Sequence, residues 1–275
     1  MVIMHNLASM NAQRQYGIVS GRKNKASEKL ASGFRINRSA DDAAGLAISE
    51  KLRWQARGLN KASENCKTGV SVCQVADGAL AEVSEMLHRM TELSIQSAND
   101  TNTEEDRAAI QAEINQLKLQ IDDITSKTSF NTLPIFNGSG TGNDPLKLWI
   151  QAGAKDMEGM DIEIDKMSTE VLEIEDVDVS DRDGAEEAIG KIQGALEKVS
   201  ANRSKIGAQQ NRLEYAIAND DNTAENTAAA ESRIRDTDMA EEMVNFSKEN
   251  ILQQAGQSMM AQANQSTQGI LSLLN

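Results

Sequence analysis

Residues 52–87 read LRWQARG-LNKASEN-CKTGVSV-CQVADGA-LAEVSEM-L, and every seventh position is apolar. These positions are Leu52, Leu59, Cys66, Cys73, Leu80 and Leu87, and further apolar residues follow three places later at Ala62, Ala76, Val83 and Met90. Apolar residues spaced alternately by three and four form the seam of a coiled coil. The pattern extends over residues 43–98 without a proline. It therefore predicts one helix of about 55 residues, roughly 80 Å long.

Both cysteines of the chain occupy positions in this seam. Seven residues along one helix separate two side chains by about 10 Å, which is beyond the reach of a disulfide. Neither cysteine has a histidine near it in the sequence. We therefore interpret Cys66 and Cys73 as small buried hydrophobic residues rather than as catalytic or metal-binding thiols.

Two further segments carry apolar residues at helical spacing. Thr103 and Asp106 have the spacing of a capping box, and the apolar residues after them step by four and three. Residues 185–217 follow the same register, with Arg203 among the polar interruptions. We expect both segments to form helices that pack against the 43–98 helix.

The two ends of the chain carry apolar stripes as well, one in residues 7–30 and one that begins near Glu231. At helical spacing each stripe covers one side of a helix. The stripe residues that we single out are Leu7, Met10, Ile18, Leu30, Met243, Leu252, Ala255, Met259, Ile270 and Leu273. A single helix cannot bury such a stripe, so we expect these helices to bind one another or other chains.

Residues 130–145 contain both prolines and a glycine-rich turn, which end the helical pattern. Apolar and polar residues then alternate at period two, which predicts one β-hairpin at about residues 146–166. The acidic stretch that follows, as far as Asp183, is interpreted as a solvated linker. The expected fold class is mainly α, with long antiparallel helices in a coiled-coil-like bundle and one small β-hairpin.

The composition excludes several classes of protein. Only 2 of 275 residues are proline and 3% are aromatic, which argues against a β-sandwich and against an aromatic-lined ligand pocket. The net charge of -14 is too negative for a general nucleic-acid binder. No apolar run approaches the length of about 18 residues that a membrane helix needs. We therefore expect neither nucleic acid nor a membrane as a partner.

The charges are distributed unevenly along the chain. Residues 1–60 hold 10 basic and 4 acidic side chains, whereas residues 61–180 hold 9 and 23. The basic N-terminal segment has two possible partners, an external anionic surface or the acidic C-terminal third of the same chain. We favour the second, because acidic partners are present in the chain itself.

Candidate catalytic and metal sites are weak. His5 and His88 have no other ligand residues at metal-binding spacing. Asp176, Asp178, Ser180 and Glu187 match four positions of a calcium loop, but Asp181 stands where the sharp turn needs glycine. We expect no cofactor, no metal and no enzyme activity. Of the two classes considered, a helical enzyme and a self-assembling protein, the terminal apolar stripes favour the second.

Several long motifs resemble those of bacterial flagellins. They are LASGFRINRSADDAAGLAI at 30–48, LSIQSAN at 93–99, IQAEI at 110–114, SRIRDTD at 232–238, ILQQAGQSMMAQANQ at 251–265 and LSLL at 271–274. The resemblance covers essentially the whole chain and is loosest between about residues 130 and 185.

The resemblance implies a division into an inner domain and an outer domain. Residues 1–42 and 231–275 would be the two halves of an inner, filament-core domain in which the terminal helices pair. Residues 43–230 would be a helical outer domain that contains the hairpin. The interval between the hairpin and the returning helix is too short for a variable outer domain.

The resemblance also implies the function. Flagellins are structural subunits that polymerise into the flagellar filament after export, unfolded, through the flagellar type III apparatus. The implied partners are further copies of the chain, the export apparatus, a flagellin chaperone at the C-terminal helix, and the hook-associated and cap proteins. The implied location is the secreted filament, with a periplasmic flagellum as a variant. An alternative of the same architecture is the hook-filament junction protein.

One surface is predicted from the helical phase and from the resemblance together. Counting about 100° per residue from Leu52 predicts that Arg89 and Leu93 point away from the seam. Glu113 lies on the shoulder of the neighbouring helix, where it extends the same surface. In flagellins the matching residues lie between protofilaments and also bind the vertebrate innate immune receptor for flagellin. We therefore expect Arg89, Leu93 and Glu113 to form an assembly and receptor surface.

Overall fold

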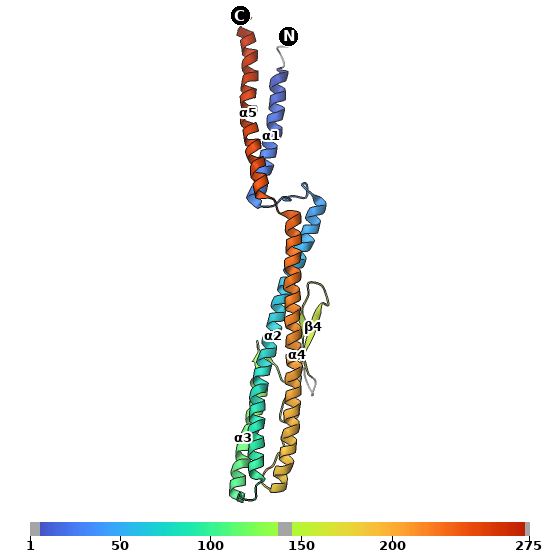
Figure 1. The fold of residues 1–275 in the computed structure, drawn as a ribbon, viewed down its shortest axis with the longest axis vertical. Helices are drawn as coiled ribbons and strands as arrows, with labels where there is room; N and C mark the ends of the chain where they lie inside the picture. Colours follow the sequence, from blue (N-terminus) through green and yellow to red (C-terminus); the bar gives the residue numbers. More distant parts are fainter. Residues whose placement is uncertain (1–5, 137–144, 273–275) are drawn as a thin grey trace. The chain divides into compact units, whose positions relative to one another are not determined.

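The computed structural model describes residues 6–136 and 145–272, with side chains described as far as residue 266 (Figure 1). Within these residues the chain forms two compact units. The first unit, unit 1, combines residues 1–55 with residues 226–275, and the second, unit 2, covers residues 56–225. The predicted domain bounds at 42/43 and 230/231 stay a prediction. None of the described helices holds an apolar stretch long enough to span a bilayer.

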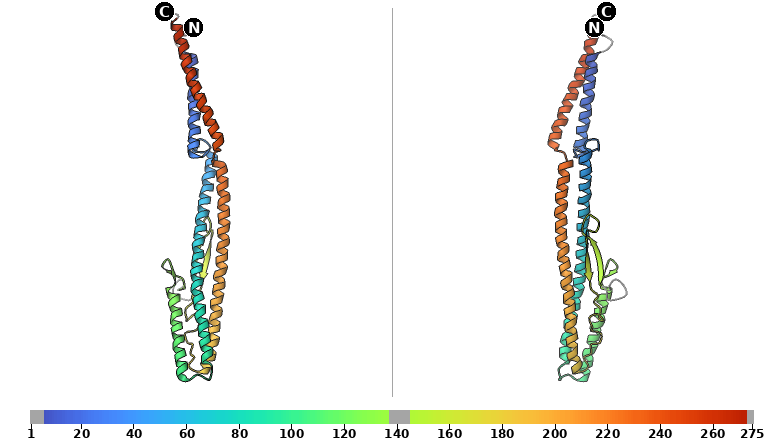
Figure 2. Two further views of the ribbon diagram at one scale, coloured as in Figure 1. Left: turned by 60° about the vertical axis from the view of Figure 1, so that its left-hand side comes forward. Right: turned by 90° about the vertical axis from the view of Figure 1, so that its right-hand side faces the viewer.

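Unit 1 is built on α1 (Leu7–Ser32) and α5 (Met239–Ser272), which lie side by side (Figures 1 and 2). The side chain of Asn6 caps the first helix by accepting the backbone N–H of Ser9 at 3.0 Å. Gly33 ends it in the left-handed conformation, φ +75°, which glycine adopts without a steric penalty. The predicted pairing of the terminal helices is confirmed.

Unit 2 contains α3 (Glu104–Lys127) and most of α2 (Ala43–Ser97) and α4 (Arg182–Arg235). The capping box of Thr103 and Asp106 is present at the start of α3, as predicted. The predicted seam is also confirmed, because Cys66, Cys73, Leu80, Leu87 and Met90 are all fully buried. They belong to one apolar cluster with residues of α3 and α4, which include Ile114, Ile121, Ile192, Val199 and Ile206.

The predicted hairpin is confirmed as β3 (Leu146–Gln151) and β4 (Gly159–Ile164), paired antiparallel. Its inner face contributes Ile162 and Ile164 to the core of unit 2. The prediction of only one hairpin is wrong, because β1 (Ser129–Phe130) and β2 (Leu133–Pro134) form a second short ladder. The two residues that join them, Asn131 and Thr132, both have a positive φ, as a tight hairpin turn requires.

The interpretation of the stretch before Asp183 as a solvated linker is also wrong. Leu172, Ile174, Val177 and Val179 are at most 2% exposed and belong to the core of unit 2. Polar contacts attach this segment to α3: Gln111 accepts the Val179 N–H at 2.7 Å, and Asp122 accepts the N–H and the hydroxyl of Thr169. The acidic side chains between the apolar ones remain at the surface.

Candidate assembly and recognition surfaces

The contact between α1 and α5 is largely polar. Lys23 Nζ donates to Asn250 at 3.0 Å and to Gln253 at 2.9 Å, and Gln253 donates to the Tyr16 hydroxyl at 3.3 Å. Ser9 donates to Asn264 at 2.7 Å. Hydrogen bonds of this kind contribute about 1 kcal/mol each, and less where water competes. The interface therefore orients the two helices through hydrogen bonds, and it also half-buries the rings of Tyr16 and Phe246.

The apolar residues of these helices remain exposed instead. The predicted stripe residues that are exposed are Leu7 (70%), Met10 (60%), Ile18 (43%), Met243 (52%), Leu252 (41%), Met259 (60%) and Ala255. Leu30 is half-buried. Ile270 and Leu273 lie outside the residues whose side chains the structure describes. Val244 and Ile251, which the sequence analysis did not single out, are 68% and 66% exposed.

Part of this stripe forms a shallow hollow on α5. Met243, Val244, Ser247, Lys248 and Ile251 line it, and its volume is about 400 Å³. On a helical wheel at about 100° per residue, Val244 and Ile251 lie opposite Glu249, which is buried. The hollow therefore belongs to the side of α5 that α1 leaves uncovered. An exposed apolar surface of this kind is typical of a site for another protein chain.

The predicted surface on α2 and α3 has an ion-pair network at its centre. The Arg89 guanidinium contacts the Glu113 carboxylate at 2.9 Å and the Glu92 carboxylate at 3.3 Å. The hydrogen bonds that the guanidinium donates to these carboxylates raise the pKa of Arg89, so that its positive charge is fixed. All three side chains are about half exposed or more. Exposed ion pairs contribute about 0 to 1 kcal/mol to stability, so this network serves mainly to fix the positions of its charges.

The predicted exposure of Leu93 is wrong. Its side chain is 2% exposed and belongs to the core cluster of unit 2. The reason is that α2 is covered by α3 as well as by α4, so its buried side is broader than a two-helix seam. Arg89 and Glu113 present their side chains to solvent, whereas Leu93 supports the same surface from beneath.

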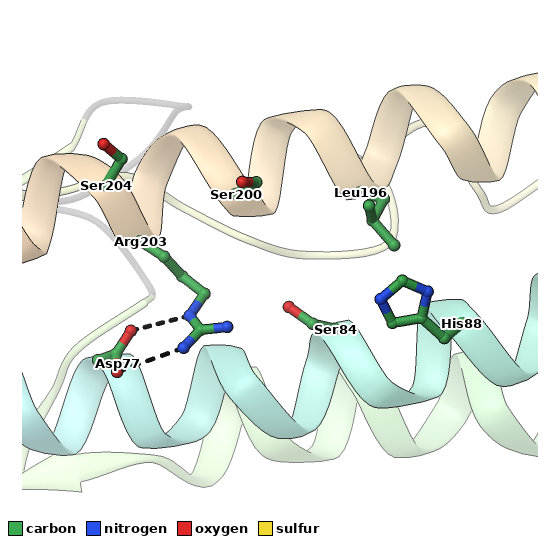
Figure 3. A pocket seen from close by; sticks show the side chains of 7 residues that line it. All are labelled: Asp77, Ser84, His88, Leu196, Ser200, Arg203 and Ser204. Carbon is green, nitrogen blue, oxygen red and sulfur yellow. Dashed lines mark hydrogen bonds and ion pairs between the residues drawn. The ribbon is translucent and has the colours of Figure 1, made fainter.

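A polar groove lies between α2 and α4 in unit 2, with a volume of about 400 Å³ (Figure 3). Asp77 and Arg203 face each other across it, with Arg203 Nε 2.8 Å from an Asp77 carboxylate oxygen. The hydroxyl of Ser84 donates to the Leu80 carbonyl, and His88 is exposed at the other end. This arrangement matches no nucleophile, base and acid constellation. It explains the polar interruption at Arg203 as one partner of an interhelical ion pair.

The remaining candidate groups are placed as follows. The pKa of the Cys66 thiol is raised by burial, and that of the Cys73 thiol is raised by burial to about 11. Asp178 accepts the N–H and the hydroxyl of Ser180, and Glu187 lies within α4. Among residues 6–136 and 145–272, no cluster of three or more histidine, cysteine or acidic side chains has metal-binding geometry.

Asp220 on α4 is a buried acidic residue that the sequence analysis missed. Its side chain is 5% exposed, and one carboxylate oxygen has no hydrogen-bond partner among the described residues. Burial, reinforced by the negative charges of Asp221 and Glu158, raises the pKa of Asp220. The ionised form therefore destabilises unit 2.

Replacing Asp220 with asparagine is expected to stabilise the folded chain by about 1 to 3 kcal/mol at pH 7. Because the folded-state pKa is raised, the stability linked to this group is fully present below its unfolded pKa of about 4 and is lost as the pH rises through the folded value. The gain from Asp220→Asn should therefore shrink toward pH 4. Thermal unfolding between pH 4 and 8 measures it, with Glu197→Gln, at an exposed acidic position of α4 that does not influence the Asp220 pKa, as the control. An equal gain in stability at pH 4 and at pH 8 would contradict the raised pKa of Asp220.

The fold and these surfaces define a class of protein: a helical subunit with paired terminal helices whose apolar faces are left for other chains. Family models give the particular family. The model of the bacterial flagellin N-terminal helical region matches residues 3–141, and that of the bacterial flagellin C-terminal helical region matches residues 189–274. The chain belongs to the flagellin family.

Individual relatives agree with this family. A flagellin of Halalkalibacterium halodurans is 49% identical over the full length of both chains, and the flagellar filament 33 kDa core protein of Treponema phagedenis is 44% identical over the full length of both. The crystal structure of Bacillus cereus flagellin is 31% identical, with a TM-score of 0.50 over 57% of this chain and 88% of that one.

Proposed function

We propose that this chain is the structural subunit of a bacterial flagellar filament and that it polymerises through the exposed apolar sides of α1 and α5. The observation that carries the proposal is the exposed apolar surface of this helix pair. Polar side chains lie between the two helices, and large apolar side chains such as Met243 and Ile251 face solvent. Burying those side chains against further copies gives about 25 cal/mol for each Å² removed from water, which favours assembly.

Polymerisation of the purified full-length chain tests this proposal directly. We expect filaments in electron micrographs above a critical concentration, because assembly buries the apolar faces cooperatively. A chain that ends at residue 238 lacks α5 and is expected to remain unassembled while unit 2 still unfolds cooperatively by circular dichroism. Filaments formed by the shortened chain would contradict the role of α5, and none formed by the full chain would contradict the function.

The partners and the location follow from this function. The subunit would leave the cell unfolded through the flagellar type III apparatus, with a flagellin chaperone covering the apolar side of α5 beforehand. In the filament it would meet the hook-associated and cap proteins. The relatives include both flagellins and a Treponema filament core protein. An external filament and a periplasmic filament are therefore both in keeping with the family. The full-length matches to flagellins favour the filament over the hook-filament junction.

The network around Arg89 supports a second role for the monomer. Arg89, Glu92 and Glu113 present one fixed cation and two anions on the exposed sides of α2 and α3. We infer that this surface is recognised by the vertebrate innate immune receptor for flagellin and is covered by a neighbouring subunit in the filament. Fixed charges of this kind mainly set the specificity of a protein complex and the rate at which the two partners associate.

A further inference from the structure

The outer face of the β3–β4 hairpin carries an exposed indole next to a carboxylate. Trp149 on β3 is 53% exposed, and Asp161 lies directly opposite it on β4. Directly opposed residues of an antiparallel pair share one face, with Cβ atoms about 5 Å apart. The indole and the carboxylate therefore lie on the same face of the hairpin.

The indole of Trp149 is held in place. A Cβ atom built on Gly159 would lie 2.5 Å from the indole carbons, so the ring lies over a position that only glycine leaves open. The indole Nε1–H also points toward Gln151, 3.4 Å from its side-chain oxygen. A ring that is already ordered loses little conformational entropy when another group binds to it.

The carboxylate of Asp161 is exposed and has no ion pair among the described residues. The lysines next to the following acidic residues, Glu163 and Asp165, are already paired. Lys147 contacts Glu163 at 3.1 Å, and Lys205 contacts Glu163 at 3.3 Å and Asp165 at 3.1 Å. Beside the indole there is thus a carboxylate that forms no ion pair with any side chain in the described part of the same copy.

We propose that Trp149 and Asp161 together bind a lysine or arginine side chain from a second copy of this chain. An aromatic face attracts a cation through its quadrupole, and a carboxylate beside it adds a charge-assisted hydrogen bond. The charge distribution indicates where the cation comes from. Residues 1–60 hold 10 basic and 4 acidic side chains, whereas residues 61–180, which include the hairpin, hold 9 and 23. Arg22 and Lys51 in the basic segment are exposed and have no ion pair among the described residues. The inference rests on the proposed filament function.

Tryptophan fluorescence of the full chain tests whether a second copy covers Trp149. Trp54→Phe leaves Trp149 as the only tryptophan. On polymerisation we expect a shift of its emission to shorter wavelength and at least a twofold fall in quenching by acrylamide. If Trp54→Phe itself alters assembly, the difference between the parent and Trp149→Phe gives the same signal. Equal quenching in monomer and filament would overturn the proposal.

Charge variants test whether the group that covers Trp149 is a cation. Asp161→Asn is expected to raise the critical concentration about two- to fivefold and to weaken its dependence on salt, because it removes one exposed ion pair, whose contribution corresponds to a change of about this size. Asp156→Asn removes the same charge from the exposed hairpin turn and serves as the matched control, with no change expected.

The outcomes separate this inference from the proposed function. If Trp149 is shielded in filaments of the parent and Asp161→Asn behaves like Asp156→Asn, the second copy covers the ring with an apolar group and the cation assignment is wrong. If the parent chain forms no filaments, the proposed function itself fails. Filaments in which Asp161→Asn alone shows weaker assembly and a smaller salt effect would support the inference.

Discussion

Leu93→Ala is expected to lower the free energy of unfolding by about 2 to 5 kcal/mol, because it removes a buried side chain and leaves a cavity. Leu93 is 2% exposed and shares its cluster with Met90 and Ile114. Chemical denaturation of the full chain, monitored by circular dichroism, measures the change. The loss should appear as a lower transition midpoint at an unchanged slope.

Arg89→Ala is the matched control at the same surface. Its side chain is half exposed, and its ion pairs with Glu92 and Glu113 should contribute less than about 1 kcal/mol to stability. Receptor activation and filament stability, by contrast, should fall for Arg89→Ala, because the exposed charge is what a partner meets. If Leu93→Ala were as stable as Arg89→Ala, the burial of Leu93 would be refuted. If Arg89→Ala activated the receptor like the parent chain, the recognition surface would lie elsewhere.

Ile251→Glu is expected to abolish polymerisation at concentrations about 100-fold above the critical concentration of the parent. The reason is that Ile251 lies in the apolar hollow on α5, and assembly would force an unpaired carboxylate into apolar surroundings at a cost of several kcal/mol. Sedimentation at a series of concentrations measures the effect. The thermal unfolding of the monomer should stay unchanged, because Ile251 is 66% exposed.

Gln257→Glu adds the same charge to the same helix at an exposed polar position and is the control for Ile251→Glu. It should shift the critical concentration only slightly. Equal loss of assembly in both variants would mean that added charge, rather than the apolar hollow, controls polymerisation.

The long helices could be predicted from the sequence because their burial repeats every seven residues. Cys66, Cys73, Leu80 and Leu87 line one seam, and all four are fully buried. The capping box at Thr103 could also be predicted, because the two side chains and the backbone groups that they bind are neighbours in the chain. These features depend on local spacing, which a single sequence records in full.

The burial of Leu93 depends on a contact that is not local. Val72, Ala79, Met86 and Leu93 follow one another at intervals of seven along the edge of the seam, and all belong to the core cluster or pack against it. A two-helix seam would leave this row at its margin. Because α3 packs beside α2, this row is covered. The buried side of α2 that was predicted from packing against one helix was therefore too narrow. The apolar character of the row was the signal that could have indicated this.

The segment from Leu172 to Val179 was misread for a different reason. Its acidic side chains dominate the composition, whereas its apolar residues alternate with them at short intervals and reach the core. Composition averages over the two sides of an extended segment, so it hides a buried side.

The surface at Trp149 and Asp161 follows from the strand register, which sets the two residues opposite each other.

The two buried thiols have a consequence for the oxidation chemistry of the folded subunit. Oxidants attack the thiolate, and a thiol with a pKa of about 11, such as that of Cys73, is ionised in only about one molecule in a thousand at pH 8. Cys66 is fully buried as well, and its pKa is raised in the same direction. Folded copies packed at high density should therefore neither cross-link through sulfur nor lose their core to sulfinic acid.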